Sequence, residues 1–533
     1  MPKSPPCFDL IQSLDKAEKI YFKRYLSYQS GKGEPTVYLK LFDELDKMAD
    51  YDVERLERKF KGQKFVKHLP VSLNYLNNLL LNSLVNFHSK KDDNLVADEM
   101  LGEIRILFQK RLYKQCARYI KRARKFMEER EYYRHLYTLG SYEYNLAASR
   151  MQRGELTELK RINSERKACL RRLDDEISIF NLNDQLTHYA REKQLNPSRN
   201  FAAEMADIAQ QLAVLKGGFE DGTTTFRLFF MLTTERLYYV NNQPIESLRA
   251  AHHYVKIRRN LSETLRYSHS TDLTAISNHL TKAIEMWFVD EAEYWLPELE
   301  VIRTQAQDLQ HRADLFMWYF RFQVLLRRGH FEELANLVTE SIGELEILLK
   351  NNVAYYRVWM FENLALYYFL VGNFRESLTW IDRIFEQKDT DEWIRQRIVN
   401  MRLIEIMAHF NLENYELVKS LCRSFERALK KLQSYDGEFT EELSWIKKIR
   451  KSEAYFLPRQ MKDFAQTLLP EGYFSVPPNY RLLLMSVWAK AHHNKISLRE
   501  SWVNHTGNIL TEMRSVAGME VLCFGESLPG PSG

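Results

Sequence analysis

The chain has 533 residues, with 76 Lys and Arg against 71 Asp and Glu and a formal charge of +5. Apolar residues make up 45 % and aromatic residues 13 %, which excludes intrinsic disorder for the bulk of the chain. Only 19 Gly and 14 Pro are present, about half their usual frequency. Because a fold of many short strands needs many such turn residues, an all-β fold is excluded and an all-α fold is predicted.

Residues 1–92 predict an N-terminal helical cap or small domain. Apolar residues recur every three or four positions from Phe8 to Tyr28, and further helices are predicted over 37–48, 53–60 and 70–87. No apolar stretch typical of a secretory signal opens the chain, so none is expected.

A basic segment follows between Arg105 and Arg130, with ten Lys or Arg residues and two acidic residues. Its densest group of cations is Lys121, Arg122, Arg124 and Lys125. Such a segment could neutralise phosphates and bind nucleic acid. It also fits a solvated helix face, because an apolar stripe runs along the other side of the same helix, and this second interpretation is favoured.

From residue 95 to 455 the pattern predicts helix pairs joined by short turns. One anchor residue from each turn falls every 39 to 48 residues, about 43 on average. The anchors are Tyr113, Leu156, Phe201, Pro244, Ala292, Phe331, Phe374 and Tyr415. A unit of this length holds one helical hairpin, which must stack on its neighbours to cover its apolar face. The tract therefore predicts an α-solenoid with a concave docking surface.

The best-defined unit lies in residues 361–384 and resembles the tetratricopeptide repeat. The residues that match the family pattern are Phe361, Leu364, Ala365, Tyr368, Gly372, Phe374 and Ser377. The interval of about 43 residues differs from the 34 of that family, so longer helices or wider turns are expected. The resemblance implies a right-handed superhelical array of antiparallel helix pairs, and a binding scaffold rather than an enzyme.

Aromatic and Arg side chains share two helices of this tract. The candidate partner-binding residues are Trp318, Tyr319, Arg321, Arg357 and Trp359. Most aromatic residues at helical spacing are expected in the core. Since Trp, Tyr and Arg are enriched at the energetic centres of protein interfaces, these five residues are the predicted binding strip.

The last part of the chain predicts a C-terminal helical cap over 456–524 and a disordered tail over 525–533. Proline marks this change, because only three prolines occur between residues 71 and 457. The longest apolar run, 364–371, is too short to span a membrane. Five scattered cysteines without a C-x-x-C pair indicate a reducing compartment, so a cytoplasmic location is predicted.

No motif predicts catalysis or a cofactor. The pairs His252–His253 and His492–His493 diverge by about 100° on a helix, and no histidine follows either pair at four residues, so no metal site is expected. The Gly-rich stretch 217–222 lacks the G-K-[ST] of a phosphate-binding loop.

The predicted function is a cytoplasmic, non-enzymatic interaction scaffold that binds a peptide or helix of another protein in a superhelical groove. Tyr and Trp side chains would anchor the partner and Arg would select carboxylates. The alternative is a regulatory nucleic-acid-associated protein that uses the basic helix 105–130. An enzyme is the third and weakest hypothesis, and the sequence does not indicate the oligomeric state.

Overall fold

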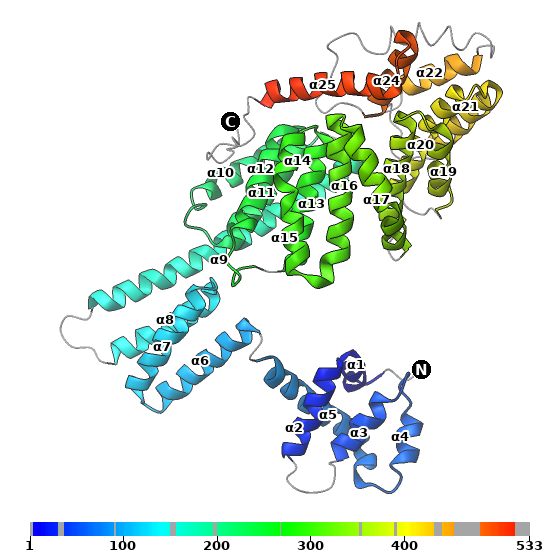
Figure 1. The fold of residues 1–533 in the computed structure, drawn as a ribbon. Coiled ribbons are helices and arrows are strands. Elements are labelled where there is room, and N and C mark those ends of the chain that lie inside the picture. The colour runs from blue at the N-terminus through cyan, green and yellow to red at the C-terminus, as the bar shows by residue number, and fades with distance from the viewer. Residues whose placement is uncertain are drawn as a thin grey trace. The chain divides into compact units, whose positions relative to one another are not determined.

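The computed structural model is helical throughout the residues that it describes (Figure 1). These are 4–29, 37–89, 92–149, 156–195, 200–266, 268–350, 354–387, 392–430, 440–451 and 480–517. Within these ranges every regular element is an α-helix or a short 3-10 helix, and no strand occurs. The all-α prediction is therefore confirmed for them. None of their helices is both long and apolar enough to cross a membrane.

The chain divides into two compact units, residues 1–174 and 175–533. The boundary lies inside α9 (Leu156–Leu195), and so within the predicted repeat tract 95–455. The predicted tail 525–533 and the Pro-rich stretch before Tyr480 lie outside the described residues. Each unit is considered by itself.

The first unit has two hydrophobic cores. One joins the helices that precede residue 89, with Phe22, Phe42 and Leu76 fully buried. These helices are α1 (Pro6–Ser13), α2 (Lys16–Gln29), α3 (Val37–Asp46), α4 (Val53–Lys59), the 3-10 helix η1 (Lys64–His68) and α5 (Leu69–His88). The other core joins α6 (Asp93–Gln109), α7 (Tyr113–Glu128), α8 (Tyr133–Ala148) and the start of α9.

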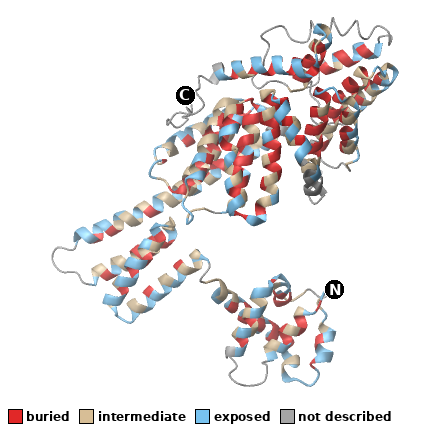
Figure 2. Ribbon diagram, viewed as in Figure 1, coloured by how far each residue is buried: buried red, intermediate tan, exposed pale blue. Residues whose placement is uncertain are grey.

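The second unit is built mainly from helices that pack on their neighbours in the chain. Its first helices are the end of α9, α10 (Ala202–Lys216), α11 (Thr224–Val240), α12 (Pro244–Arg259), α13 (His269–Glu285), α14 (Val289–Trp295) and α15 (Pro297–Gln305). A short 3-10 helix, η2 (Gln307–Leu309), leads to α16 (Gln310–Arg328), α17 (Phe331–Lys350), α18 (Ala354–Leu370), α19 (Phe374–Phe385), α20 (Glu392–Asn411), α21 (Tyr415–Leu429) and α22 (Thr440–Lys451). The last two described helices are α24 (Tyr480–Asn494) and α25 (Leu498–Ala517). Buried residues from α12 to α25 form one large core, and those of the end of α9, α10 and α11 form a second core (Figure 2).

One type of turn ends eight of the described helices, two in the first unit and six in the second. A residue with positive φ follows the helix, and the N–H of the next residue donates to the carbonyl five positions before it at 2.8–3.1 Å. The positive-φ residues are Arg111, Glu131, Asn242, Trp287, Gly329, Gly372, Glu413 and Lys495. This is the Schellman motif, which satisfies the last helical carbonyls while it reverses the chain.

The turns recur at the interval expected from the sequence. From Asn242 to Glu413 the positive-φ residues follow one another at separations of 41 to 45 residues. Five of the eight predicted anchors are the first residue of a helix, and Leu156 is the first described residue of α9. Phe201 immediately precedes α10, and Ala292 lies inside α14. The sequence pattern therefore located the turns between helices, although the period alone does not establish a solenoid.

The C-terminal helix α25 returns to the middle of the second unit. It packs on α16 and α18 as well as on α24, its neighbour in the chain. Trp502 of α25 is fully buried, and its indole N–H donates to the carbonyl of Leu326 at 2.8 Å. Arg514 pairs with Asp290 at 3.0 Å. Helix α25 therefore makes long-range contacts, which an array whose repeats contact only their neighbours would lack.

Candidate ligand-binding cavity

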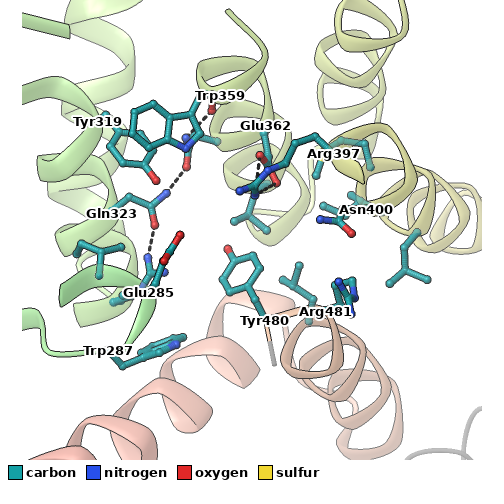
Figure 3. A pocket seen from close by; sticks show the side chains of 18 residues that line it. Glu285, Trp287, Tyr319, Gln323, Trp359, Glu362, Arg397, Asn400, Tyr480 and Arg481 are labelled. Carbon is teal, nitrogen blue, oxygen red and sulfur yellow. Dashed lines mark hydrogen bonds and ion pairs between the residues drawn. The ribbon is translucent and has the colours of Figure 1, made fainter. Parts of the chain in front are cut away.

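A polar cavity of about 280 Å³ lies in the second unit, lined by residues at the end of α13 and on α16, α18, α20 and α24 (Figure 3). Four aromatic side chains contribute to its wall: Trp287, Tyr319, Trp359 and Tyr480. The wall also carries both acidic and basic groups, with Glu285 and Glu362 among the former and Arg327 and Arg397 among the latter. The volume is close to the lower end for ligand-binding pockets in proteins.

Helical spacing brings these side chains to one place. On α16, Tyr319, Gln323 and Arg327 are four residues apart and therefore share a face. A similar spacing of three or four residues occurs on α18, where Trp359, Asn363 and Leu366 line the cavity. On α20 the lining residues with this spacing are Arg397, Asn400, Met401 and Ile404. Three helices thus each present one stripe to a common space.

A chain of hydrogen bonds joins α16 to α18 beside the cavity. Arg327 donates from Nη1 to Gln323, and Gln323 donates from Nε2 to Asn363. Asn363 in turn donates to the carbonyl of Trp359 at 2.6 Å. Since these side chains are buried, their mutual bonds hold the amides in a single orientation.

Arg397 and Arg481 have acidic partners. Arg397 donates to Glu362 at 3.2 Å, and Arg481 donates from Nε to Glu442 at 3.0 Å. The charge of Glu362 is the main reason that the pKa of Arg397 is raised. These two cations are therefore largely neutralised within the protein.

Arg327 and Glu285 have no ion-pair partner within 4.0 Å among the described residues. Arg327 is only 5 % exposed, and its guanidinium lies 4.9 Å from the centre of the Trp287 ring. Burial lowers the pKa of Arg327 and raises the pKa of Glu285, because both charged forms lose water. Glu285 itself remains in contact with solvent. The cavity therefore holds one buried cation without a close carboxylate partner, whereas the Glu285 carboxylate is exposed to solvent.

Two buried polar atoms at this cavity lack a hydrogen-bond partner among the described residues. They are Nε of Arg327, a donor, and Oδ1 of Asn400, an acceptor. Figure 3 shows the Asn400 side chain and the hydroxyl end of Tyr480 directed toward the space between the helices. An unpaired buried polar atom costs about 1–3 kcal/mol, so a ligand that supplies the missing bonds would be stabilised there.

The two tyrosines are neutral hydrogen-bonding groups. Burial raises the pKa of both Tyr319 and Tyr480, so their hydroxyls stay protonated at any physiological pH. Tyr319 is also stacked on Trp359, with ring centres 3.6 Å apart. The aromatic wall thus offers flat apolar area with a hydroxyl at its edge.

The structure separates the five residues of the predicted binding strip. Tyr319 and Trp359 line the cavity, whereas Trp318 is buried and stacked on Phe322. Arg321 is exposed and does not line the cavity, and Arg357 donates to Gln387 at 3.1 Å. The strip omitted Gln323 and Arg327 of α16, three cavity residues of α18, and the cavity residues of the α13 end, α20 and α24, which are remote in sequence. The four-residue spacing of Tyr319, Gln323 and Arg327 was the available signal.

The unit that resembles the tetratricopeptide repeat forms a helical hairpin of α18 and α19. Leu364, Ala365 and Ser377 are buried, and the Ser377 hydroxyl donates to the carbonyl of Ala365 at 2.7 Å. Gly372 has φ +81°, and Phe361 packs against Trp380. Of the remaining pattern residues, Tyr368 contacts Tyr367 and Phe374 contacts Phe369. These are structural contacts of the hairpin.

The basic group on α7 is partly neutralised within the first unit. Arg124 pairs with Glu128, Glu143 and Glu165, and Arg130 pairs with Asp93. Lys121, Arg122 and Lys125 are exposed. The apolar stripe of α7 is buried, as expected, at Cys116, Ile120, Ala123 and Met127.

Comparison with known proteins identifies no relative. No protein-family model, no curated protein and no solved structure matches this chain.

Proposed function

We propose that this protein is an interaction scaffold that takes a short segment of a partner protein into the cavity between α13, α16, α18, α20 and α24. The observation that carries the proposal is the pairing of an aromatic wall with the unpartnered atoms Arg327 Nε and Asn400 Oδ1. Trp, Tyr and Arg in a desolvated pocket are the composition of an interface hot spot.

The polar groups of the cavity define what the segment must offer. Arg327 Nε needs an acceptor, whereas Asn400 Oδ1 needs a donor. A peptide segment supplies both, since each residue carries one carbonyl and, except for proline, one N–H. The volume equals that of about nine liquid water molecules, so the cavity would take an anchor of one or two residues while the rest of the segment lies outside.

The recurring turns support a scaffold built from helical hairpins. Eight Schellman turns, five of them at intervals of 41 to 45 residues, give a chain of similar units. We therefore retain the tetratricopeptide-like superhelical array, with the first 92 residues as its N-terminal cap, as part of the proposal. The proposed activity is binding, without catalysis or a cofactor.

The test uses the full chain and a displayed library of random peptides. Selected peptides are labelled, and their affinities are measured by fluorescence anisotropy for the wild type, Asn400→Leu and Tyr480→Phe. Each substitution removes hydrogen-bonding capacity from the cavity and should weaken binding about tenfold, the equivalent of one buried hydrogen bond. Circular dichroism checks that the variants keep their helicity.

Tyr294→Phe is the matched control, because Tyr294 is exposed and does not line the cavity. It should bind the peptides as the wild type does. Equal affinity for the wild type and both cavity variants would contradict the proposed site, and a library that yields no binding peptide would contradict a peptide partner.

The nucleic-acid alternative rests on the exposed cations of α7, Lys121, Arg122 and Lys125. It is the weaker proposal, because the neighbouring Arg124 and Arg130 already pair with carboxylates. Binding through this helix would fall steeply as salt rises, which a salt titration with single- and double-stranded nucleic acid would detect.

A further inference from the structure

Two histidines and a glutamate meet where α12, α13 and α14 converge. Nδ1 of His252 lies 2.6 Å from Oε1 of Glu291, and Nε2 of His279 lies 2.7 Å from the same oxygen. All three potential ligand atoms lie within 4.8 Å of one another. None of these residues lines the cavity described above, so the cluster is a separate feature of the second unit.

The cluster is well shielded from water. The side chains of His252, His279 and Glu291 are 12 %, 1 % and 6 % exposed. An isolated carboxylate is rarely buried to this degree, because it loses its hydration, so buried charges are paired or coordinate metals. The buried Glu291 carboxylate therefore requires a specific partner or ligand.

Three nitrogen atoms converge on one carboxylate oxygen of Glu291. The indole N–H of Trp295 lies 2.9 Å from Glu291 Oε1 and 3.3 Å from His252 Nδ1, and indole nitrogen can only donate. If His252 Nδ1 and His279 Nε2 both carry a proton, they and the Trp295 N–H all donate to Glu291 Oε1. If Nδ1 is unprotonated, two lone pairs face each other across 2.6 Å. A cation can take the place of the two imidazole protons, since the two nitrogen atoms and the carboxylate oxygen then all act as lone-pair donors.

We infer that His252, His279 and Glu291 bind a divalent transition-metal ion, with Zn²⁺ the best match among the metals that imidazole and carboxylate ligands suit. Zn²⁺ takes nitrogen and carboxylate oxygen ligands at about 2.0–2.2 Å. Tetrahedral geometry at those lengths separates ligand atoms by about 3.3 Å, so the side chains must open by somewhat more than half an ångström. A water molecule takes the fourth position, as in other zinc sites with three protein ligands.

Trp295 completes the site as an outer-shell group. Its indole N–H donates to Glu291 Oε1 from four residues along the chain, and this bond orients the carboxylate. The metal would join three consecutive helices, α12, α13 and α14, and so stabilise this part of the second unit.

The sequence did not reveal this set, because its members lie on three helices, 27 and 12 residues apart. The neighbouring His253 belongs to no such cluster. The expectation that adjacent histidines cannot share an ion still holds for His252 and His253, and His279 and Glu291 supply the other ligands instead.

The experiment uses the full chain without a polyhistidine tag, stripped of metal with a chelator and dialysed. Zn²⁺ is then added in competition with a chromophoric chelator, and Co²⁺ is added separately to record its visible d–d absorption. The wild type should bind one Zn²⁺ per chain and give the intense Co²⁺ bands of a four-coordinate site.

Three variants remove one ligand each: His252→Gln, His279→Gln and Glu291→Gln. Each should weaken Zn²⁺ binding by more than about 100-fold, beyond the 10–100-fold cost of losing an outer-shell partner. His253→Gln is the matched control on the same helix and should keep the wild-type affinity. Glu291→Gln preserves size and a hydrogen-bond acceptor, so it separates loss of the ligand from loss of a structural bond.

The inference is overturned if the stripped wild type binds neither Zn²⁺ stoichiometrically nor Co²⁺ with these bands. It is also overturned if the ligand variants bind Zn²⁺ as tightly as His253→Gln. The wild-type Co²⁺ spectrum decides the question even if a variant fails to fold.

Discussion

The indole N–H of Trp502 donates to the backbone carbonyl of Leu326 at 2.8 Å, across 176 residues of sequence. Leu326 lies in the last turn of α16, and its carbonyl also accepts the N–H of Gly329 at 3.1 Å. The Trp502 side chain thus bonds to the C-terminal end of α16, where a Schellman turn already satisfies the last carbonyls. This contact holds the C-terminal helix against α16, which supplies three residues of the cavity wall.

Trp502→Phe should destabilise the second unit by about 1–3 kcal/mol beyond the cost of the smaller ring, because it removes one buried hydrogen bond. Trp488→Phe is the control, since Trp488 is equally buried and its indole nitrogen has no hydrogen-bond partner among the described residues. Denaturant unfolding of the full chain measures both. Equal destabilisation by the two changes would show that the Trp502 bond contributes nothing.

Gly329→Ala should destabilise the chain more than Gly372→Ala. Both glycines have positive φ, +74° and +81°, so an added Cβ costs about 1–2 kcal/mol at either position. At Gly329 that Cβ would also lie 2.9 Å from Cγ2 of Val503, whereas at Gly372 nothing lies within 4 Å. Because Val503 is 39 % exposed and can shift aside, this close contact adds about 1 kcal/mol, the low end of the cost of overpacking.

Chemical denaturation of the two glycine variants gives the comparison directly. A combined Gly329→Ala, Val503→Ala variant should recover the added cost, because the smaller side chain makes room for the new methyl group. Equal free energies of unfolding for the two single variants would mean that α25 does not lie against this turn.

The α3–α4 region should become less stable in acid, because protonation of Glu44 removes a stabilising carboxylate. Its buried carboxylate accepts bonds from Lys59 and, at 2.9 Å, from Arg55 Nε, and the Lys59 bond is the main reason that its pKa is lowered. Stability gained from a lowered pKa is complete above the unfolded value of about 4.3 and is lost as pH falls through the folded value. Glu44→Gln should therefore cost about 1–3 kcal/mol near neutral pH and progressively less below pH ~4.

Hydrogen exchange of the α3 and α4 amides in the full chain, corrected for intrinsic rates, reports this local stability. The control is Glu57→Gln, since Glu57 is exposed on the same helix as Lys59 and should leave exchange unchanged. A constant difference between the wild type and Glu44→Gln at all pH values would rule out this titration.

Arg124 should contribute more to the stability of α8 and α9 than the exposed cations Lys121 and Arg122 do. Arg124→Gln breaks ion pairs to Glu143 on α8 and to Glu165 on α9, so exchange in these helices should quicken by the equivalent of about 1 kcal/mol. Lys121→Gln and Arg122→Gln change exposed residues and should alter stability by less than about 0.5 kcal/mol. If all three changes acted alike, Arg124 would be only another solvated cation.

The sequence by itself determined the helical class and the positions of many turns. Gly and Pro disfavour helix interiors, so their low number favours long helices. The local spacing of apolar residues indicates where these helices end. Tyr113, Pro244, Phe374 and Tyr415, which the pattern placed in turn segments, each begin the helix that follows a turn. These features depend on contacts within about ten residues, so a single sequence carries them.

The tertiary structure alone decided which side chains meet. The return of α25 to α16 joins Trp502 to Leu326, and no periodic pattern specifies a contact over that distance. Likewise, Tyr480 joins Tyr319 at the cavity, and Glu291 joins His252 and His279. The spacing of apolar residues predicts which face of a helix is apolar. Which distant segment packs against that face depends on how side chains fit together in three dimensions, and local spacing does not specify this.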